Sequence, residues 1–196
     1  PDTTLGRAQR GRDDRAARDR AHVQERIPSF NALPIQYSDF IDWQRRWLNA
    51  GENDRQLAYW RTCLGFSHPV LLLPSDRPRK PVANYQASRH SFDLTPDLVN
   101  SLRQVAQKRG ATLFMALLAA FQVLLYRYTG QQEIRVGVPI ANRNRLETAG
   151  LIGFFVNTQV LRGEIRGRMT LLDVLDQVRE AAIEAQAHQD LPFEQL

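Results

Sequence analysis

The chain has 196 residues, 43% of them hydrophobic, so it is long enough to bury a core as one domain or one large subdomain. Its formal net charge of +5 comes largely from arginines near the N-terminus, where no aromatic residue precedes Phe30, and this composition argues against nucleic acid as a partner. The apolar runs are too short for a membrane span, no secretory signal is visible, and Cys63 is the single cysteine, which favours a cytoplasmic location without disulfides.

Residues 1–32 differ in composition from the rest of the chain. They are rich in Arg, Asp and Ala, carry few large apolar side chains, and show no helical period of apolar positions. We interpret them as an Arg-rich leader that is disordered or non-native, and residues 33–196 as the folded part.

A helix is predicted from Ser38, which is a favourable N-cap residue. Large apolar residues then recur at spacings of three and four, namely Phe40, Trp43 and Trp47. Gly51 interrupts this helix, and Asp54 is predicted to cap a second one. The apolar residues of the second helix are Leu57, Trp60 and Leu64.

The middle of the chain predicts a loop, a strand and a helix. Four prolines in Pro69–Pro81 indicate a surface loop, and alternation over Arg89–Leu94 indicates a strand. Thr95 is predicted to cap the helix, with Pro96 in its first turn and Gly110 at its end. The buried stripe of this helix is expected to be Leu98, Leu102, Val105 and Ala106.

The last elements complete an alternation of helices and strands. Residues 112–128 are apolar nearly all round, which predicts a helix buried on most sides. Strands are predicted at Ile134–Ile140, with Pro139 at an edge or strand end, and at Phe154–Leu161. Thr170 begins a capping-box sequence for a final helix with a stripe of Leu171, Leu175, Val178 and Ala182. This order predicts an α/β fold of two layers.

The segment YSDFIDW places three aromatic residues on one side of a helix start: Tyr37, Phe40 and Trp43. Asp39 and Asp42 suit the positive N-terminal end of the same helix. We interpret the segment as a packing anchor.

In the segment VGVPIANRNR, a strand enters a polar turn that carries Arg143 and Arg145. A buried arginine needs a carboxylate or several carbonyls as partners. Two interpretations therefore stay open: an ordered Arg143 beside a binding site, or solvated arginines in a loop.

The segment LIGFFVNTQVLR contains Gly153 at a turn where backbones can approach closely. In the strand that follows, Asn157 and Gln159 are expected to project from one face. Their amides suit hydrogen bonding to an amide-bearing ligand, and cross-strand hydrogen bonding is the alternative.

The segment HQDLPFEQL begins with His188, which is expected to cap the end of a helix, where the helix dipole favours a cation. Asp190 is predicted to cap the turn at Pro192 and Phe193. No second histidine lies at metal-ligand spacing and no nucleophile lies nearby in the sequence, so neither a metal site nor a catalytic residue is predicted.

In this order, YSDFIDW, LIGFFVNTQVLR and HQDLPFEQL resemble motifs of nonribosomal peptide synthetase condensation domains, and the resemblance covers residues 33–196. It implies a chloramphenicol-acetyltransferase-like C-terminal subdomain, truncated at both ends, whose N-terminal subdomain is missing. The family's His-His-x-x-x-Asp-Gly motif does not occur, because the four histidines are isolated: His22, His68, His90 and His188.

The resemblance also implies a function. Condensation domains form peptide bonds between thioesters that carrier proteins deliver on phosphopantetheine arms, so the implied partners are carrier proteins and an adjacent adenylation domain, with no cofactor bound by this chain. Arg143, Asn157 and Gln159 are expected to line the pantetheine tunnel. We expect the isolated chain to form no peptide bond. An epimerisation or heterocyclisation domain, and a non-catalytic module that binds carrier proteins, stay open as alternatives.

Overall fold

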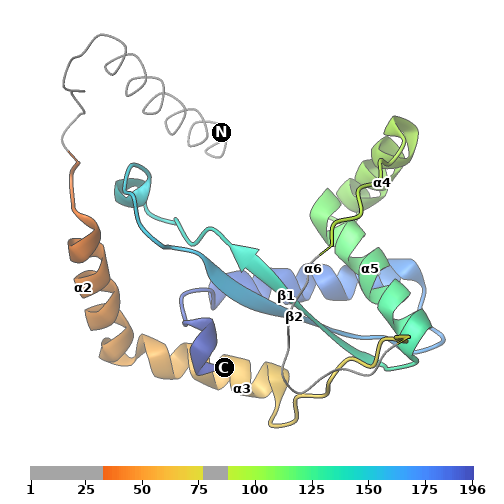
Figure 1. Ribbon diagram of the computed structural model, residues 1–196, viewed down its shortest axis with the longest axis horizontal. Helices are drawn as coiled ribbons and strands as arrows, with labels where there is room; N and C mark the ends of the chain where they lie inside the picture. The colour runs from red at the N-terminus through yellow and green to blue at the C-terminus, as the bar shows by residue number, and fades with distance from the viewer. Residues whose placement is uncertain (1–32, 77–87) are drawn as a thin grey trace.

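The computed structural model describes residues 33–76 and 88–196. The predicted leader and the end of the predicted loop Pro69–Pro81 lie outside the described residues. Figure 1 shows helices α2 (Tyr37–Trp47), α3 (Asn53–Leu64), α4 (Pro96–Lys108), α5 (Leu113–Thr129) and α6 (Leu171–Ala187), strands β1 (Glu133–Ile140) and β2 (Asn157–Glu164), and short helical turns η1 (Leu48–Glu52), η2 (Leu146–Thr148) and η3 (Phe193–Gln195).

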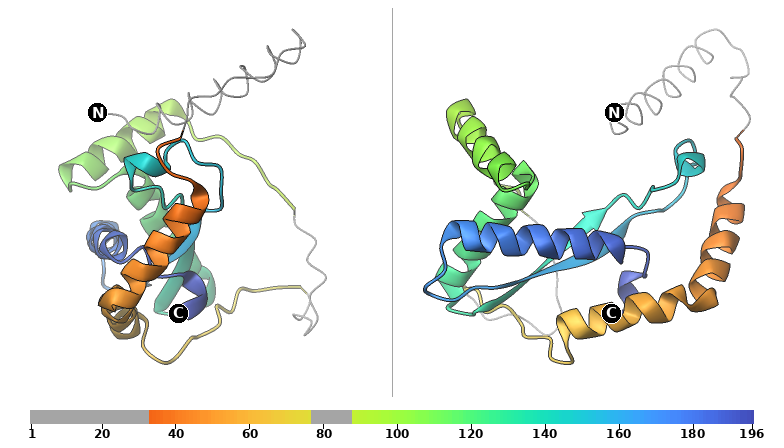
Figure 2. Two further views of the ribbon diagram at one scale, coloured as in Figure 1. Left: turned by 90° about the vertical axis from the view of Figure 1, so that its left-hand side faces the viewer. Right: turned by 180° about the vertical axis from the view of Figure 1, so that it is seen from behind.

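Strands β1 and β2 form an antiparallel pair in which Val138 lies opposite Gln159 and Ile140 lies opposite Asn157. Helix α6 runs across one face of this pair, as the view from behind in Figure 2 shows, and α5 packs against both α6 and β1. Buried side chains of these elements and of α3 form one core, which includes Trp60, Leu118, Ile134, Leu161, Val174 and Val178. The described part therefore combines helix and sheet, as predicted.

A π-helical turn joins α2 to α3 where the sequence predicted an interruption. Gly51 in this turn has a φ of +109°, which other residues rarely adopt, and the helix kinks there. The predicted caps are wrong. Ser38 lies inside α2, after the cap residue Gln36, whose backbone N–H donates to the Asp39 carboxylate over 2.8 Å. Asp54 lies in the first turn of α3 instead of at its cap.

The predicted strand Arg89–Leu94 is wrong. This segment is irregular, and its side chains are exposed, with Phe92 at 74%. Within 33–76 and 88–196 the sheet consists of β1 and β2, so the segment has no strand to pair with. Alternation in the sequence indicates a strand but cannot supply the neighbouring strand whose hydrogen bonds stabilise it.

Helix α4 begins as predicted, with the Thr95 hydroxyl accepting a hydrogen bond from the Leu98 backbone and Pro96 in the first turn. The predicted burial of α4 is only partly right, because Ala106 is buried whereas Leu98 and Val105 are exposed. The predicted burial of α5 on most sides is also wrong. Its exposed apolar residues are Phe114, Leu117, Phe121, Leu124 and Tyr128. Periodicity could not identify the buried side of α5, since both sides are apolar.

Among the described residues, no single helix is long and apolar enough to cross a membrane. Helices α4 and α5 meet that criterion only as a pair, and this pair is bent by 101°.

Both strands after α5 form, with one shift in position. β1 agrees with the prediction, and Pro139 lies near its end. β2 begins at Asn157 instead of Phe154, and it extends to Glu164. Because β2 starts later than predicted, residues 141–156 form a long loop between the strands, and this loop contains the short turn η2.

Helix α6 begins with the predicted capping box. The Thr170 hydroxyl accepts from the Asp173 backbone N–H over 3.2 Å, and the Asp173 carboxylate accepts from the Thr170 backbone N–H over 2.7 Å. Leu171 is exposed, contrary to the predicted stripe, and the buried residues of α6 are Val174, Leu175, Val178 and Ala185.

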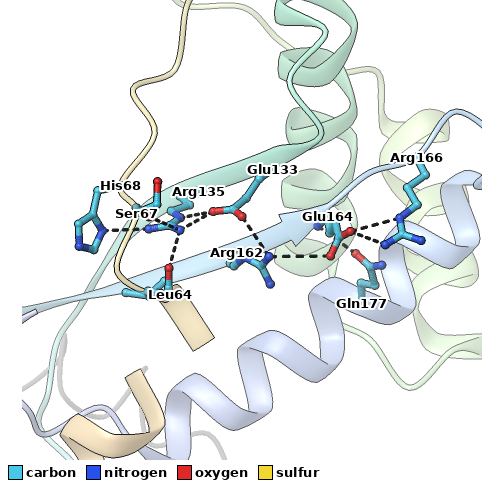
Figure 3. Close-up of polar contacts among 9 residues, drawn as sticks. All are labelled: Leu64, Ser67, His68, Glu133, Arg135, Arg162, Glu164, Arg166 and Gln177. Carbon is cyan, nitrogen blue, oxygen red and sulfur yellow. Dashed lines mark hydrogen bonds and ion pairs between the residues drawn. The ribbon is translucent and has the colours of Figure 1, made fainter. Parts of the chain in front are cut away.

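Charged side chains connect β1, β2 and the chain after α3 (Figure 3). Glu133 accepts hydrogen bonds from Arg135 over 2.5 Å and from Arg162 over 3.0 Å. Arg135 also donates to the backbone carbonyls of Leu64 (2.6 Å) and Ser67 (2.9 Å). Glu133 therefore holds an arginine that in turn fixes the end of α3 against the sheet.

Glu133→Gln is expected to lower the free energy of unfolding by about 1 kcal/mol at pH 7. Burial alone would raise the pKa of Glu133, but hydrogen bonds from Arg162 and Arg135 outweigh it and hold the pKa below the ordinary 4.5. The stabilisation is therefore complete above the unfolded-state pKa and is lost as the pH falls through the lower folded-state value. Urea unfolding of both proteins at pH 7 and pH 3 measures it. Glu147→Gln, at an exposed position, is the control, and an equal loss at both pH values would contradict the prediction.

Candidate functional site

Arg143 is fixed by the backbone of its own loop. Its guanidinium donates to the carbonyls of Thr148 (2.6 Å) and Leu151 (2.9 Å), and it lies 3.9 Å above the centre of the Phe155 ring. Carbonyls and a ring face thus take the place of the carboxylate that a half-buried arginine otherwise needs. The result is an ordered loop between β1 and β2.

The YSDFIDW segment packs against the far end of the same loop. The rings of Phe40 and Phe155 have centroids 4.8 Å apart, and Tyr37 meets Phe155 edge-on at 5.2 Å. The Tyr37 hydroxyl donates to the Phe154 carbonyl over 2.7 Å. A Cβ atom on Gly153 would overlap the Tyr37 ring, so only glycine fits there. The two sequence motifs therefore form one small core.

The amide nitrogen and the amide oxygen of Asn157 both form hydrogen bonds with the segment after α6. Its Nδ2 donates to the carbonyls of Gln189 (2.8 Å) and Leu191 (2.7 Å), and its Oδ1 accepts from the Phe193 backbone N–H over 3.1 Å. Gln159 is buried and donates from Nε2 to the Ala185 carbonyl in the last turn of α6 over 2.8 Å. Both amides thus fix β2 to α6 and the turn after it. Their contact with a pantetheine arm stays a prediction.

Helix α3 holds the same turn from the other side, through Gln56, which was not singled out in the sequence, and through Trp60, which was predicted only as an apolar residue of the helix. Gln56 is completely buried, and its Oε1 accepts from the backbone N–H groups of Asp190 (3.1 Å) and Leu191 (2.8 Å). The Trp60 indole donates to the His188 carbonyl over 2.9 Å. The sequence contained a signal for the burial of Gln56. Gln56, Trp60 and Leu64 follow one another at spacings of four residues, so the amide of Gln56 lies on the same side of the helix as two core residues.

His188 is the C-cap residue of α6, as predicted. Its Nδ1 lies 2.8 Å from the Glu184 carbonyl, and Arg55 lies 3.0 Å from its Nε2. A guanidinium can only donate, so Nε2 is the acceptor in the contact with Arg55. The ring also stacks on Tyr59 with centroids 3.8 Å apart.

Asp190 does not cap the turn that follows it, contrary to the prediction. The N–H of Phe193 is taken by Asn157, and Pro192 precedes η3 without a side-chain cap. Burial raises the pKa of the Asp190 carboxyl, and a hydrogen bond from Gln56 offsets this only in part. Asp190 instead lines a hollow beside α2, together with Trp43.

The described residues offer little for proton or metal chemistry. His68 accepts from Arg135, His188 lies 3.0 Å from Arg55, and His90 stacks on Phe92. Among the described residues, no three His, Cys, Asp or Glu side chains form a group suited to a metal ion. The arrangement instead orders two loops, 141–156 and 188–193, around the end of β2 where Asn157 lies.

A family model described as the condensation domain matches residues 24–196. The chain belongs to the condensation-domain family. Among curated relatives, this condensation-domain chain is 51% identical over 176 residues to one of the subunits of linear gramicidin synthase from Brevibacillus parabrevis, covering 90% of the chain and 3% of that protein. It is 47% identical over 164 residues to phosphinothricin tripeptide synthetase PhsC of Streptomyces viridochromogenes, covering 84% of the chain and 15% of that protein.

Solved structures agree with the family assignment. The X-domain from teicoplanin biosynthesis is 28% identical, with a TM-score of 0.80 over 89% of this condensation-domain chain and 40% of that chain. The condensation domain from the monacolin K polyketide synthase MokA is also 28% identical, with a TM-score of 0.69 over 85% of this chain and 40% of that one. The chain therefore spans less than half of these solved structures, and a small share of the curated relatives.

Proposed function

We propose that this chain is the C-terminal-subdomain part of a condensation domain, with a two-layer, chloramphenicol-acetyltransferase-like architecture, and that it positions carrier-bound thioesters for peptide-bond formation. The observation that carries the proposal is the family match over residues 24–196. The fold similarity to solved condensation domains supports it. The curated relatives are peptide synthases several to many times longer than this chain, so the activity is proposed for the complete protein.

In the proposed reaction, the acceptor amine attacks the carbonyl carbon of the donor thioester. A C–N bond forms, the C–S bond breaks, and the donor carrier's thiolate leaves and takes up the proton that the amine loses. General acid–base assistance contributes about 10²–10⁴-fold to such a step, and orientation supplies much of the rest. The described histidines are isolated, so we assign the proton transfer to the N-terminal subdomain and the orientation in part to this chain.

Arg143, Asn157 and Gln159 are proposed to shape the wall of the pantetheine tunnel. The hydrogen bonds of Arg143 and Asn157 support a role in holding the loops 141–156 and 188–193 in place. In this role their side chains act through the backbone they fix, and carrier proteins and an adjacent adenylation domain remain the proposed partners.

A chimera tests the proposed function. Residues 33–196 replace the matching segment of a condensation domain in linear gramicidin synthase, and amide product is measured by mass spectrometry with both carrier proteins loaded. We expect product from the chimera and none above background from the isolated chain. Product from the isolated chain, or an inactive chimera that binds both carriers and keeps its fold, would contradict the proposal.

A second candidate function is a non-catalytic binding module. The observation that favours it is the TM-score of 0.80 with the teicoplanin X-domain, which has been solved in complex with OxyB. If the chain has this second function, it binds a partner protein even when the domain that contains it forms no amide bond. The same chimera distinguishes the two, because a binding module would leave it inactive in amide formation.

A further inference from the structure

A hollow of about 310 Å³ lies between α2, the loop after β1 and the turn after α6. None of the residues predicted for the tunnel lines it. One wall consists of aromatic side chains of α2, in which Trp43 and Trp47 stack with centroids 5.4 Å apart. The polar residues around it are Gln44, Asn142, Asn144, Arg145, Thr148 and Asp190.

Arg145 provides a hydrogen-bond donor at this hollow. The central carbon of its guanidinium lies 3.7 Å from the centre of the Trp43 ring, which is a cation–π contact. Within the part of the chain that the structure describes, this guanidinium makes no hydrogen bond or ion pair, whereas the neighbouring Arg143 donates to carbonyls of its own loop. A stacked guanidinium keeps its N–H groups at its edge, where a ligand oxygen can accept from them.

Asp190 provides an acceptor at the same hollow. Its backbone N–H donates to Gln56, and Asn157 donates to the carbonyl of the next residue, so the backbone that carries the carboxylate is held in place. A carboxylate has about four acceptor sites, and the hydrogen bond from Gln56 uses one of them. Arg145 and Asp190 form no ion pair, although the guanidinium is close enough to lower the pKa of the Asp190 carboxyl, so each keeps hydrogen-bonding atoms for a third group.

We propose that this hollow binds a secondary amide flanked by aliphatic carbon, with its carbonyl on Arg145, its N–H on Asp190 and its plane beside Trp43 and Trp47. An anion would satisfy Arg145 but would be repelled by Asp190, and a cation would have the reverse problem. An uncharged amide matches both groups and can lie against the indole walls. The pantetheine arm and the peptide backbone both carry such amides, and choosing the first as the source rests on the proposed function.

Indole NMR signals test the proposal on the full chain labelled with ¹⁵N. The probes are pantetheine, N-acetylglycine N-methylamide and inorganic phosphate. We expect at least one amide probe to shift the Trp43 and Trp47 signals, while Trp60, which is buried and bonded to the His188 carbonyl, stays in place. A response to pantetheine alone identifies the arm as the source, and a response to the blocked amino acid alone identifies peptide backbone.

Arg145→Gln is expected to weaken that response at least about tenfold, and Arg61→Gln, at an exposed position of α3, is expected to leave it unchanged. An unshifted Trp60 signal shows that each variant is folded. The proposal is overturned if neither amide probe shifts Trp43 and Trp47, if phosphate alone does so, or if Arg145→Gln binds as well as the original chain. Because this experiment measures binding, such a result would refute the proposed site but not the proposed condensation function, which the chimera tests separately.

Discussion

Replacing Gln56 with alanine is expected to lower the free energy of unfolding by about 3–5 kcal/mol, a large part of the stability of a domain. The amide is completely buried and accepts two backbone N–H groups, those of Asp190 and Leu191, while its Nε2 donates to Glu52 over 2.9 Å. Truncation leaves these groups without partners, and each buried unpaired group costs about 1–3 kcal/mol. Urea unfolding monitored by tryptophan fluorescence measures the loss.

Gln104→Ala is the matched control for this experiment, because Gln104 lies exposed on α4, and its effect is expected to stay within about 0.5 kcal/mol. A loss below about 1 kcal/mol for Gln56→Ala would mean that water reaches the turn and replaces the amide. In that case Gln56 would not be the residue of α3 that fixes residues 190–191.

Asn157→Asp is expected to destabilise the chain in a way that depends on pH. The change keeps the side-chain shape but replaces two N–H donors with an oxygen that faces the carbonyls of Gln189 and Leu191. These carbonyls disfavour the charged form, so the folded-state pKa of the introduced carboxyl should exceed the ordinary value of about 3.9. We expect a loss of about 2–4 kcal/mol at pH 7. The loss should be smallest below the unfolded-state pKa and grow as the pH rises through the folded-state value.

Two comparisons give this experiment its controls. Asn157→Ala removes the same hydrogen bonds without adding a titrating group, so its loss should not change between pH 3 and pH 7. Asn100→Asp makes the same chemical change at an exposed position of α4 and should cost little at either pH. A pH-independent loss for Asn157→Asp would show that the carbonyls are not close to the side chain in solution.

Both predictions concern the turn after α6, whose backbone has few partners in helices or strands. Side chains take their place: Gln56 and Trp60 from α3, and Asn157 from β2. Buried backbone groups need such partners, so the turn keeps its shape only while α3 and β2 both hold it. The turn that carries Asp190 is therefore rigid at the hollow beside α2.

Several features of the fold could be predicted from local signals. The capping box at Thr170, the cap at Thr95 and the strand around Pro139 depend on neighbours within a few residues, and all three form. The family resemblance also depended on short motifs, and the family match confirms it. By contrast, the strand at Arg89–Leu94 failed because strand formation needs a partner that alternation does not reveal.

The same contrast applies to the candidate site. From the sequence alone, Asn157 and Gln159 could be placed on one face of a strand, because strand geometry follows from residue spacing. For Arg143 the sequence left open whether the side chain is ordered or solvated, since only a buried arginine requires partners. The partners of these side chains follow from the packing of distant segments. The amide of Asn157 meets carbonyls more than thirty residues away, and Gln56 meets backbone N–H groups more than a hundred residues away. No local pattern encodes such contacts, since they arise only when α3, β2 and the turn after α6 pack together.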